Sequence, residues 1–279
     1  MTATARAAPR APFALSRDRL LAGLFLIASL NALSALAAGS VARDGWALAA
    51  ANLFGVSAVI WAALAAGLKI LREERASEPP RHGDLWIAAA VGVAALLPVA
   101  TASMLALTLV AGYAILTAPR ATPLRRAGLV FLAMSGALLW GRVTLAVFSR
   151  PLLDLDALFV SRLIGAEQQG NMLISGGTRL IVAPGCSSIQ GLSLALLFCV
   201  TFSQLFEIRF DRRAASWFAA ALAATVAINV LRIGAMLRFP DHLPAIHDGW
   251  GYQLSMWATL AAVAAICVIG ARRELFPRA

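Results

Sequence analysis

The chain has 279 residues, of which 60% are hydrophobic and only 14% charged, and its mean hydropathy is +0.78. A soluble domain of this length cannot bury so much apolar surface, so the composition excludes an ordinary soluble globular protein. The net charge of +10 would suit a nucleic-acid partner, but the basic residues lie in short segments between apolar blocks, as topology determinants do. We therefore expect a membrane protein with no nucleic-acid partner.

The apolar residues form blocks of roughly 17 to 25 residues, the length that a helix needs to cross a bilayer core. They predict an all-α polytopic membrane protein of about eight transmembrane helices, folded as one domain over residues 1–279. The predicted spans are 20–38, 46–68, 85–99, 101–118, 127–148, 187–206, 214–238 and 251–270.

Two parts of the N-terminal half admit alternatives. Residues 1–19 are polar and basic, and the first span after them is long enough to stay as an uncleaved crossing, although the segment 35–37 (Ala-Leu-Ala) resembles a signal-peptidase site. The apolar run from Leu85 to Ala118 is too long for one comfortable crossing. A turn at Pro98 and Thr101 would divide it into two spans, and one long tilted or broken helix is the alternative.

The distribution of positive charge predicts the topology. With eight spans, the strongly basic segments all fall on one side of the membrane. The positive-inside rule then places both termini on the cytoplasmic side of the cytoplasmic (inner) membrane. Merging the two spans of 85–118 would move the N-terminal clusters outside, which favours the division. The basic segments are Arg6 to Arg19, Lys69 to Arg81, Arg120 to Arg126, Arg209 to Arg213 and Arg272 to Arg278.

Residues 149–186 form a long extracytoplasmic connection that leads to a cysteine, and long structured loops tend to be functional. Its first part predicts a short amphipathic helix lying in the membrane interface. Two apolar strands, 172–175 and 178–182, then flank Gly176-Gly177 and predict a β-hairpin. The interfacial helix would present Leu152, Leu153, Leu155, Phe159, Leu163 and Ile164 on one side.

Cys186 directly follows the predicted hairpin, in the turn sequence Pro-Gly-Cys-Ser-Ser-Ile-Gln. Ser187 and Gln190 fit a capping box, which would place Cys186 at the N-terminal edge of a membrane helix. The positive end of the helix dipole would favour a thiolate there, and the backbone N–H groups of Ser187 and Ser188 would receive an oxyanion. A small buried residue at a helix start is the alternative interpretation.

The other two cysteines predict packing rather than chemistry. Cys199 and Cys267 both lie inside apolar runs, where a free cysteine behaves as a small hydrophobic residue. No pair of cysteines has the spacing of zinc ligands or of a redox motif, so we expect neither a metal nor a cofactor.

Two arginines lie inside predicted spans, where a charge is costly and is normally paired or functional. Arg232 belongs to the seventh span, and Asn229 would share its helix face and orient the guanidinium or a substrate carbonyl. Structural pairing or snorkelling of Arg232 is the alternative. Arg142 lies at a similar depth in the fifth span, where it would either bind an acidic substrate side chain or form a salt bridge.

The outer loop before the last span carries two histidines. We prefer His247 to His242 because Asp248, a glycine and the entry to the last span follow it and fix it near the outer rim. Either Asp248 or Asp241 would orient its ring. The topology thus brings a thiol, a guanidinium and an imidazole to one membrane face, which predicts acyl transfer through a thioester.

The order of these residues resembles the exosortase/archaeosortase family. The resemblance covers roughly residues 127–270 and rests on VAPGCSSIQGL, then NVLR inside the next span, then IHDGWGY in the following loop. It implies a membrane cysteine peptidase or transpeptidase in which Cys186 is the nucleophile and Arg232 and His247 are its partners. Members process exported proteins with a C-terminal sorting tail of the PEP-CTERM type, made of a short motif, a transmembrane helix and a basic end. Many exosortases have Ser-Gly or Ala-Gly after the cysteine, whereas this chain has two serines.

Several questions stay open at the level of the sequence. An amine acceptor would make the enzyme a transpeptidase and water would make it a protease, and the recognised motif and oligomeric state do not follow from the residues. A transporter or lipid-handling protein with a path lined by Arg142 and Arg232 is the alternative from another class, and a non-catalytic assembly subunit is a third. Membrane lipids are expected contacts in each case.

Overall fold

The computed structural model describes residues 15–73 and 78–276, most of which are helical. Six helical segments among these residues are long and apolar enough to cross a bilayer, which supports an all-α membrane-embedded protein. They are α1 (Arg17–Ala51), α4 (Ala100–Thr117), the segment Pro123–Val147 formed by α5 (Pro123–Ser135), a π-helical turn (Gly136–Trp140) and α6 (Gly141–Val147), the segment Pro184–Leu205 that contains α8 (Ser188–Leu205), α9 (Arg212–Arg238) and α11 (Trp250–Gly270).

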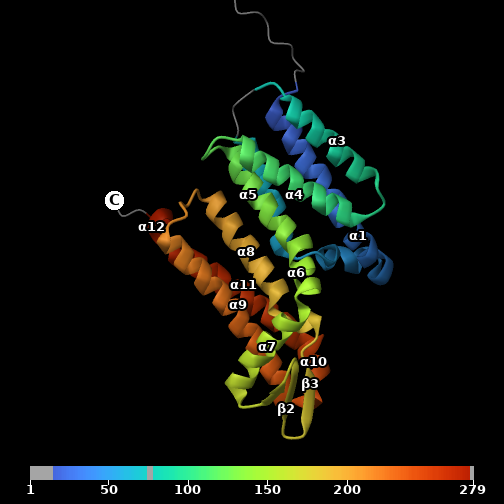
Figure 1. Ribbon diagram of the computed structural model, residues 1–279, viewed down its shortest axis with the longest axis vertical. Coiled ribbons are helices and arrows are strands. Elements are labelled where there is room, and N and C mark those ends of the chain that lie inside the picture. Colours follow the sequence, from blue (N-terminus) through green and yellow to red (C-terminus); the bar gives the residue numbers. More distant parts are fainter. Residues whose placement is uncertain (1–14, 74–77, 277–279) are drawn as a thin grey trace, which may run out of the picture.

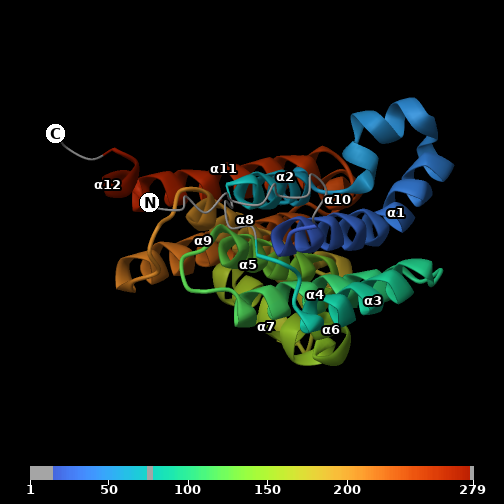
Figure 2. The ribbon, with the colours of Figure 1, turned by 90° about the horizontal axis from the view of Figure 1, so that it is seen from above.

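The predicted second span, 46–68, is wrong in its first part. α1 is kinked at Gly45, whose φ of 72° is not helical, its last stretch ends at Ala51, and the chain then turns before α2 (Ala58–Arg72) begins. Leu53 and Phe54 adopt positive φ values of 51° and 58°, which interrupts a right-handed helix. The Ser57 hydroxyl then accepts a hydrogen bond from a backbone N–H in the first turn of α2 and caps that helix. Figure 2 shows this end of α1 arching away from the other helices.

The apolar run from Leu85 to Ala118 contains two helices rather than one. α3 (His82–Leu96) and α4 pack against each other and against α1 (Figure 1). The break lies at Leu97, whose backbone is extended with ψ of 133° because the next residue is a proline, which disfavours the helical conformation before it. With 15 residues each, α2 and α3 are shorter than a full crossing requires.

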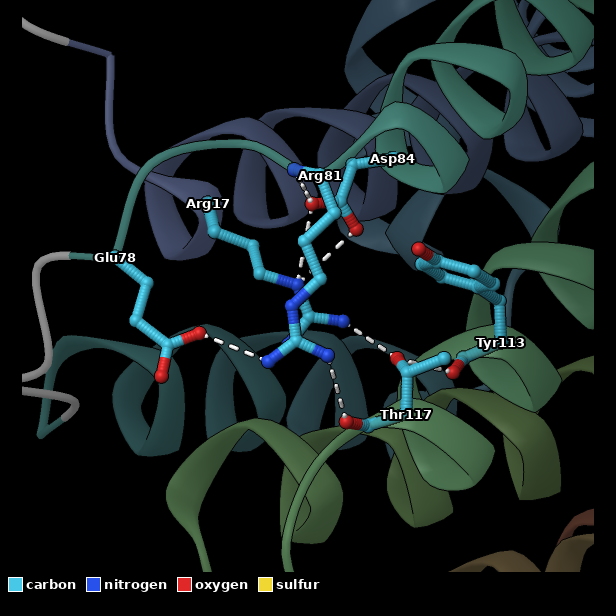
Figure 3. A network of polar contacts seen from close by, with 6 residues as sticks. All are labelled: Arg17, Glu78, Arg81, Asp84, Tyr113 and Thr117. Atoms are coloured by element: carbon cyan, nitrogen blue, oxygen red, sulfur yellow. Dashed lines mark hydrogen bonds and ion pairs between the residues drawn. The ribbon is translucent and has the colours of Figure 1, made fainter.

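A buried ion pair fastens these N-terminal helices together. Arg17, only 3% exposed at the start of α1, donates from Nε to both carboxylate oxygens of the fully buried Asp84 in α3, at 3.1 and 3.2 Å. The same guanidinium donates to Thr117 Oγ1 at the end of α4. The backbone N–H of Arg81, just before α3, donates to the Asp84 carboxylate at 2.6 Å (Figure 3). Arg17, one of the basic residues predicted to set the topology, therefore also links α1, α3 and α4.

Removal of Asp84 should destabilise the whole protein. Asp84→Ala leaves the Arg17 guanidinium buried without its counter-charge, and loss of one partner of a buried pair costs about 3 to 5 kcal/mol. We expect a clear fall in the melting temperature of the detergent-solubilised protein. Glu78→Ala is the matched control, because Glu78 pairs with Arg81 at a site that is 56% exposed and should matter little. Equal melting temperatures for Asp84→Ala and the unmodified protein would contradict this role.

The C-terminal half begins with the long connection. α7 (Ser149–Ile164) leads into a three-stranded antiparallel sheet in the order β1, β2, β3. Ser175 lies opposite Thr178, and Gly176 and Gly177 between them have positive φ values of 56° and 83°, as a tight turn requires. The sequence did not predict β1. The elements are β1 (Glu167–Gln169), β2 (Met172–Ser175), β3 (Thr178–Ile181), 3-10 turns at Pro184–Cys186 and Pro240–His242, α10 (Leu243–His247) and α12 (Arg272–Leu275).

The apolar residues of α7 do not share one face, contrary to the prediction. Leu153 is buried, and Ile164 packs in the same cluster against α9 and the sheet. This buried face also carries Asp156, which no pattern in the sequence singles out. Part of the side of α7 that was predicted to face the membrane therefore packs against α9 and the sheet. The exposed apolar residues of α7 are Leu155, Phe159 and Leu163.

The two ends of the bundle differ in charge. At one end, ion pairs link the segments next to the basic loops, where Arg126 pairs with Glu73 and Glu207, and Arg213 pairs with Glu274. At the other end lie α7, the sheet, α10 and the start of α8 (Figure 1). The cysteine, arginine and histidine of the predicted site therefore belong to the end away from the basic loops.

Candidate active site

Cys186 closes the 3-10 turn before α8 and is only 4% exposed. Ser187 follows in an extended conformation, with φ of −66° and ψ of 143°. Its hydroxyl accepts a hydrogen bond at 3.3 Å from a backbone N–H in the first turn of α8, so Ser187 is the N-cap. Gln190, its predicted partner in a capping box, lines a cleft beside the helix. The thiol thus lies at the start of α8, on a backbone held by the cap.

A buried carboxylate holds the first residue of α8. Asp156, which is 5% exposed on α7, accepts a hydrogen bond at Oδ2 from the Ser188 N–H at 3.0 Å. Its Oδ1 accepts a second one from the Ser188 hydroxyl at 2.6 Å. No local sequence signal marks Asp156, because its partner lies 32 residues further along the chain.

The predicted oxyanion donors are already engaged in the structure. The Ser188 N–H donates to Asp156, and the Ser187 N–H donates to the carbonyl of Pro184 at 3.2 Å. The carboxylate of Asp156 also occupies the positive end of α8 that was predicted to favour a thiolate. A negative charge on the sulfur or on a substrate oxygen must therefore be stabilised by other groups.

Asn229 orients the backbone of the cysteine rather than a guanidinium. Its Nδ2 donates to the Cys186 carbonyl at 2.8 Å and to the Ser188 hydroxyl at 3.0 Å. An amide nitrogen has two hydrogens, so both are used. Asn229 on α9 therefore joins the turn that carries the thiol, and it has no donor left for a substrate carbonyl.

Arg232 is the free cation of the site. It is half-buried on α9, its Nε is buried without a hydrogen-bond partner, and no ion pair within the described residues includes it. Its Cζ lies 5.3 Å from the centroid of the Tyr252 ring, which holds the guanidinium by a cation–π contact. It lies within electrostatic range of the Cys186 thiol. Its remaining N–H groups are therefore available to an anion.

His247 ends α10 and has one anchor. Its Nδ1 lies 2.8 Å from Oδ1 of Asp248, so Asp248 rather than Asp241 is the carboxylate that orients the ring. Asp248 also lies within electrostatic range of the Cys186 thiol. Across residues 15–73 and 78–276, no hydrogen bond joins the imidazole to the thiol. His247 lies at the same end of the bundle as Cys186 and makes no hydrogen bond to it.

A cleft of about 500 Å³ opens beside these residues. Ser188, Asn229, Arg232 and Tyr252 line one part of it. Its other walls come from the turn after α1, the start of α2, and α8, α9 and α11, and they are largely apolar. They include Leu53, Val56, Val59, Leu194, Phe198, Met256, Leu260 and Val263.

Arg142 lies apart from the cysteine, in a smaller cavity of about 190 Å³. It is exposed on α6, and the ion pairs found among the described residues do not include it. Ser57 and Gln190 line both this cavity and the larger cleft, so the two spaces adjoin. A salt bridge, one of its two predicted roles, therefore has no support in this part of the chain.

The remaining cysteines form a buried contact that the sequence did not predict. Cys199 on α8 and Cys267 on α11 are fully buried as predicted, and their sulfur atoms lie 3.7 Å apart as free thiols. No cluster of three or more His, Cys, Asp or Glu residues within 15–73 and 78–276 has the arrangement of a metal site.

Comparison with known proteins gives no relative from which a function could be carried over. No family model, no curated protein and no solved structure matches this chain. The function must therefore be inferred from the chemistry of the site itself.

Proposed function

We propose that this protein is a membrane-embedded cysteine peptidase or transpeptidase of the exosortase type. It cleaves C-terminal sorting tails of exported proteins at the outer face of the cytoplasmic membrane. The observation that carries the proposal is the guanidinium of Arg232, whose buried Nε has no hydrogen-bond partner and which lines a cleft together with Gly185 and Ser187, the neighbours of Cys186 in the chain. A charge kept unpaired in a membrane helix is a functional residue by default.

The reaction follows from the groups at the cleft. The sulfur of Cys186 attacks the carbonyl carbon of the scissile peptide bond, and the Arg232 N–H groups stabilise the oxyanion that forms. His247, oriented through Nδ1 by Asp248, takes the thiol proton at Nε2 and returns it to the leaving amine. The C–N bond breaks, a thioester forms, and water or an amine then breaks the thioester. The imidazole closes on the thiol when substrate binds, because catalytic hydrogen bonds are often long before that step.

The cleft suits a substrate that joins a polar motif to an apolar helix. Its polar part holds Arg232, Asn229 and Tyr252, whereas its walls along α8 and α11 are apolar. A tail helix lying there would place its basic end toward the end of the bundle that carries Arg126 and Arg213 and their acidic partners. The basic end would lie on the cytoplasmic side, where the positive-inside rule places basic residues.

The direct test works even while the recognised motif is unidentified. The gene is deleted in the source cells, and the deletion is complemented with the unmodified chain or with Cys186→Ala. C-terminal peptides of the membrane and exported proteins are then compared by mass spectrometry. We expect proteins with a motif, an apolar helix and a basic end to be shortened only with the unmodified chain. Identical C-termini in all strains would overturn the proposal.

One observation favours a second function, transport or lipid handling. The cavities of Arg232 and Arg142 adjoin, so two cations without ion-pair partners in the described residues follow one connected space. An anion path would need both arginines and no thiol. It predicts that Cys186→Ala keeps full function, the reverse of what the peptidase predicts.

The placement of His247 offers a further prediction. A Cβ added at Gly251 would lie 2.7 Å from the Cα of Ile246, so Gly251→Ala must push α10 away from α11. Displacement of a catalytic group by about 1 Å can lower a rate about 100-fold. We expect processing to fall strongly at an unchanged melting temperature. Gly112→Ala is the control, since a Cβ there meets nothing within 4 Å. Equal processing by both variants would show that the position of α10 is unimportant.

A further inference from the structure

Asp156 is a buried carboxylate in an unusual position. It is 5% exposed on α7, and no basic side chain in the described part of the chain forms an ion pair with it. Both of its oxygens instead bind Ser188, one at the backbone N–H and one at the hydroxyl. A carboxylate is costly to bury, so its retention here needs a reason.

The start of α8 compensates the charge of Asp156. A carboxylate that accepts a backbone N–H at a helix N-terminus makes a charge-assisted hydrogen bond and meets the positive end of the helix dipole. The Ser188 hydroxyl donates a hydrogen bond to Asp156 and accepts one from Asn229. Asn229 in turn binds the carbonyl of Cys186. A continuous chain of hydrogen bonds therefore runs from α7 through α8 and α9 to the backbone of the cysteine.

We propose that Asp156 is a positioning residue for Cys186, acting through Ser188 and Asn229. The inference rests on the proposed cysteine chemistry. Asp156 fixes the turn that carries the thiol, so that the sulfur is held in one position toward the cleft that Arg232 lines. By occupying the N-terminus of α8, it also leaves Arg232 as the main stabiliser of negative charge at the site. Asp156 thereby makes the long connection 149–186 part of the catalytic apparatus.

The test measures two properties that should change in opposite directions. Asp156→Ala removes the acceptor of the Ser188 N–H and hydroxyl, so we expect the turn to become mobile. Cys186, which is only 4% exposed in the unmodified protein, should then become accessible. We expect its alkylation by N-ethylmaleimide to become severalfold faster, while processing of the tailed protein falls by up to about 100-fold. Peptide mass spectrometry assigns the alkylated site, and the buried Cys199 and Cys267 serve as internal references.

The control lies on the same helix. Asp154→Ala removes the same charge two residues earlier, where no side-chain bond to Ser188 is made, and it should leave both rates near those of the unmodified protein. Ser188→Ala removes the hydroxyl bond to Asp156 and keeps the backbone one, so it should change both rates in the same directions as Asp156→Ala but by less. The double variant should be no worse than Asp156→Ala, because both act through one chain of bonds. Ser188→Ala and Asp156→Asn keep the test decisive if Asp156→Ala fails to fold.

The outcomes separate this inference from the proposed function. Faster alkylation with slower processing in folded Asp156 or Ser188 variants supports the positioning role. Unchanged alkylation and processing, or additive losses in the double variant, would overturn it while leaving the peptidase intact. Full processing by Cys186→Ala would instead remove the peptidase itself, and the alkylation rates would still report whether Asp156 holds the turn.

Discussion

Replacement of Cys186 by alanine is expected to abolish processing of the tailed substrate, with the protein still folded and inserted. The Cys186 side chain is small and 4% exposed. The hydrogen bonds that shape its turn are made by the backbone of Cys186 and not by its thiol, so alanine keeps the fold. The thiol is the only group placed to form the thioester. Loss of the nucleophile in a serine protease costs on the order of 10⁶-fold in rate, and we expect a comparable loss here.

The measurement is the fraction of a tagged tail substrate that is shortened with time, followed by immunoblot. Cys199→Ala is the matched control, since it makes the same replacement in the same membrane segment at a fully buried site. It should process near the original rate. Processing by Cys186→Ala at a rate similar to that of Cys199→Ala would mean that the thiol has no chemical role.

Replacement of Arg232 is expected to have the next largest effect. Arg232→Ala removes the one unpaired cation beside the thiol among the described residues, and loss of a comparable oxyanion donor costs about 100- to 1,000-fold in rate. Arg232→Lys should recover little of this. A lysine lacks the planar fork that stacks on Tyr252 and presents several N–H groups at once.

The same helix supplies the control for Arg232. Arg238→Ala removes a positive charge at the exposed end of α9 and should change processing little. Melting temperatures of all three variants separate a loss of folding from a loss of chemistry. If folded Arg232→Ala processes as fast as Arg238→Ala, the guanidinium does not stabilise the reaction, and this role of Arg232 is wrong.

Most of the helices could be predicted because each is a long apolar run, and Pro98 revealed the break between α3 and α4 through its known effect on the preceding residue. The turn after α1 could not be predicted in the same way. Leu53 and Phe54 are apolar residues that disfavour positive φ, so nothing in their chemistry distinguishes them from a helix. Gly55, whose φ is 70°, and the Ser57 cap are the signals before α2.

The sequence predicted which candidate residues lie at this end of the bundle, but it did not predict the hydrogen bonds around them. The positions of Cys186, Arg232 and His247 follow from topology, because they lie near the ends of successive spans. The roles of Ser188 and Asn229 depend on which donors are already used, and that is decided by a carboxylate from α7. Such a partner is invisible to spacing rules, since its distance along the chain bears no relation to its distance in space.

The central claim is that Cys186 forms a thioester with its substrate, and acid quenching during turnover followed by mass spectrometry tests it most directly. We predict an added mass on the peptide that contains Cys186, removed by hydroxylamine and absent from the peptides of Cys199 and Cys267. A Cys186 peptide that stays a free thiol throughout active processing would contradict the account.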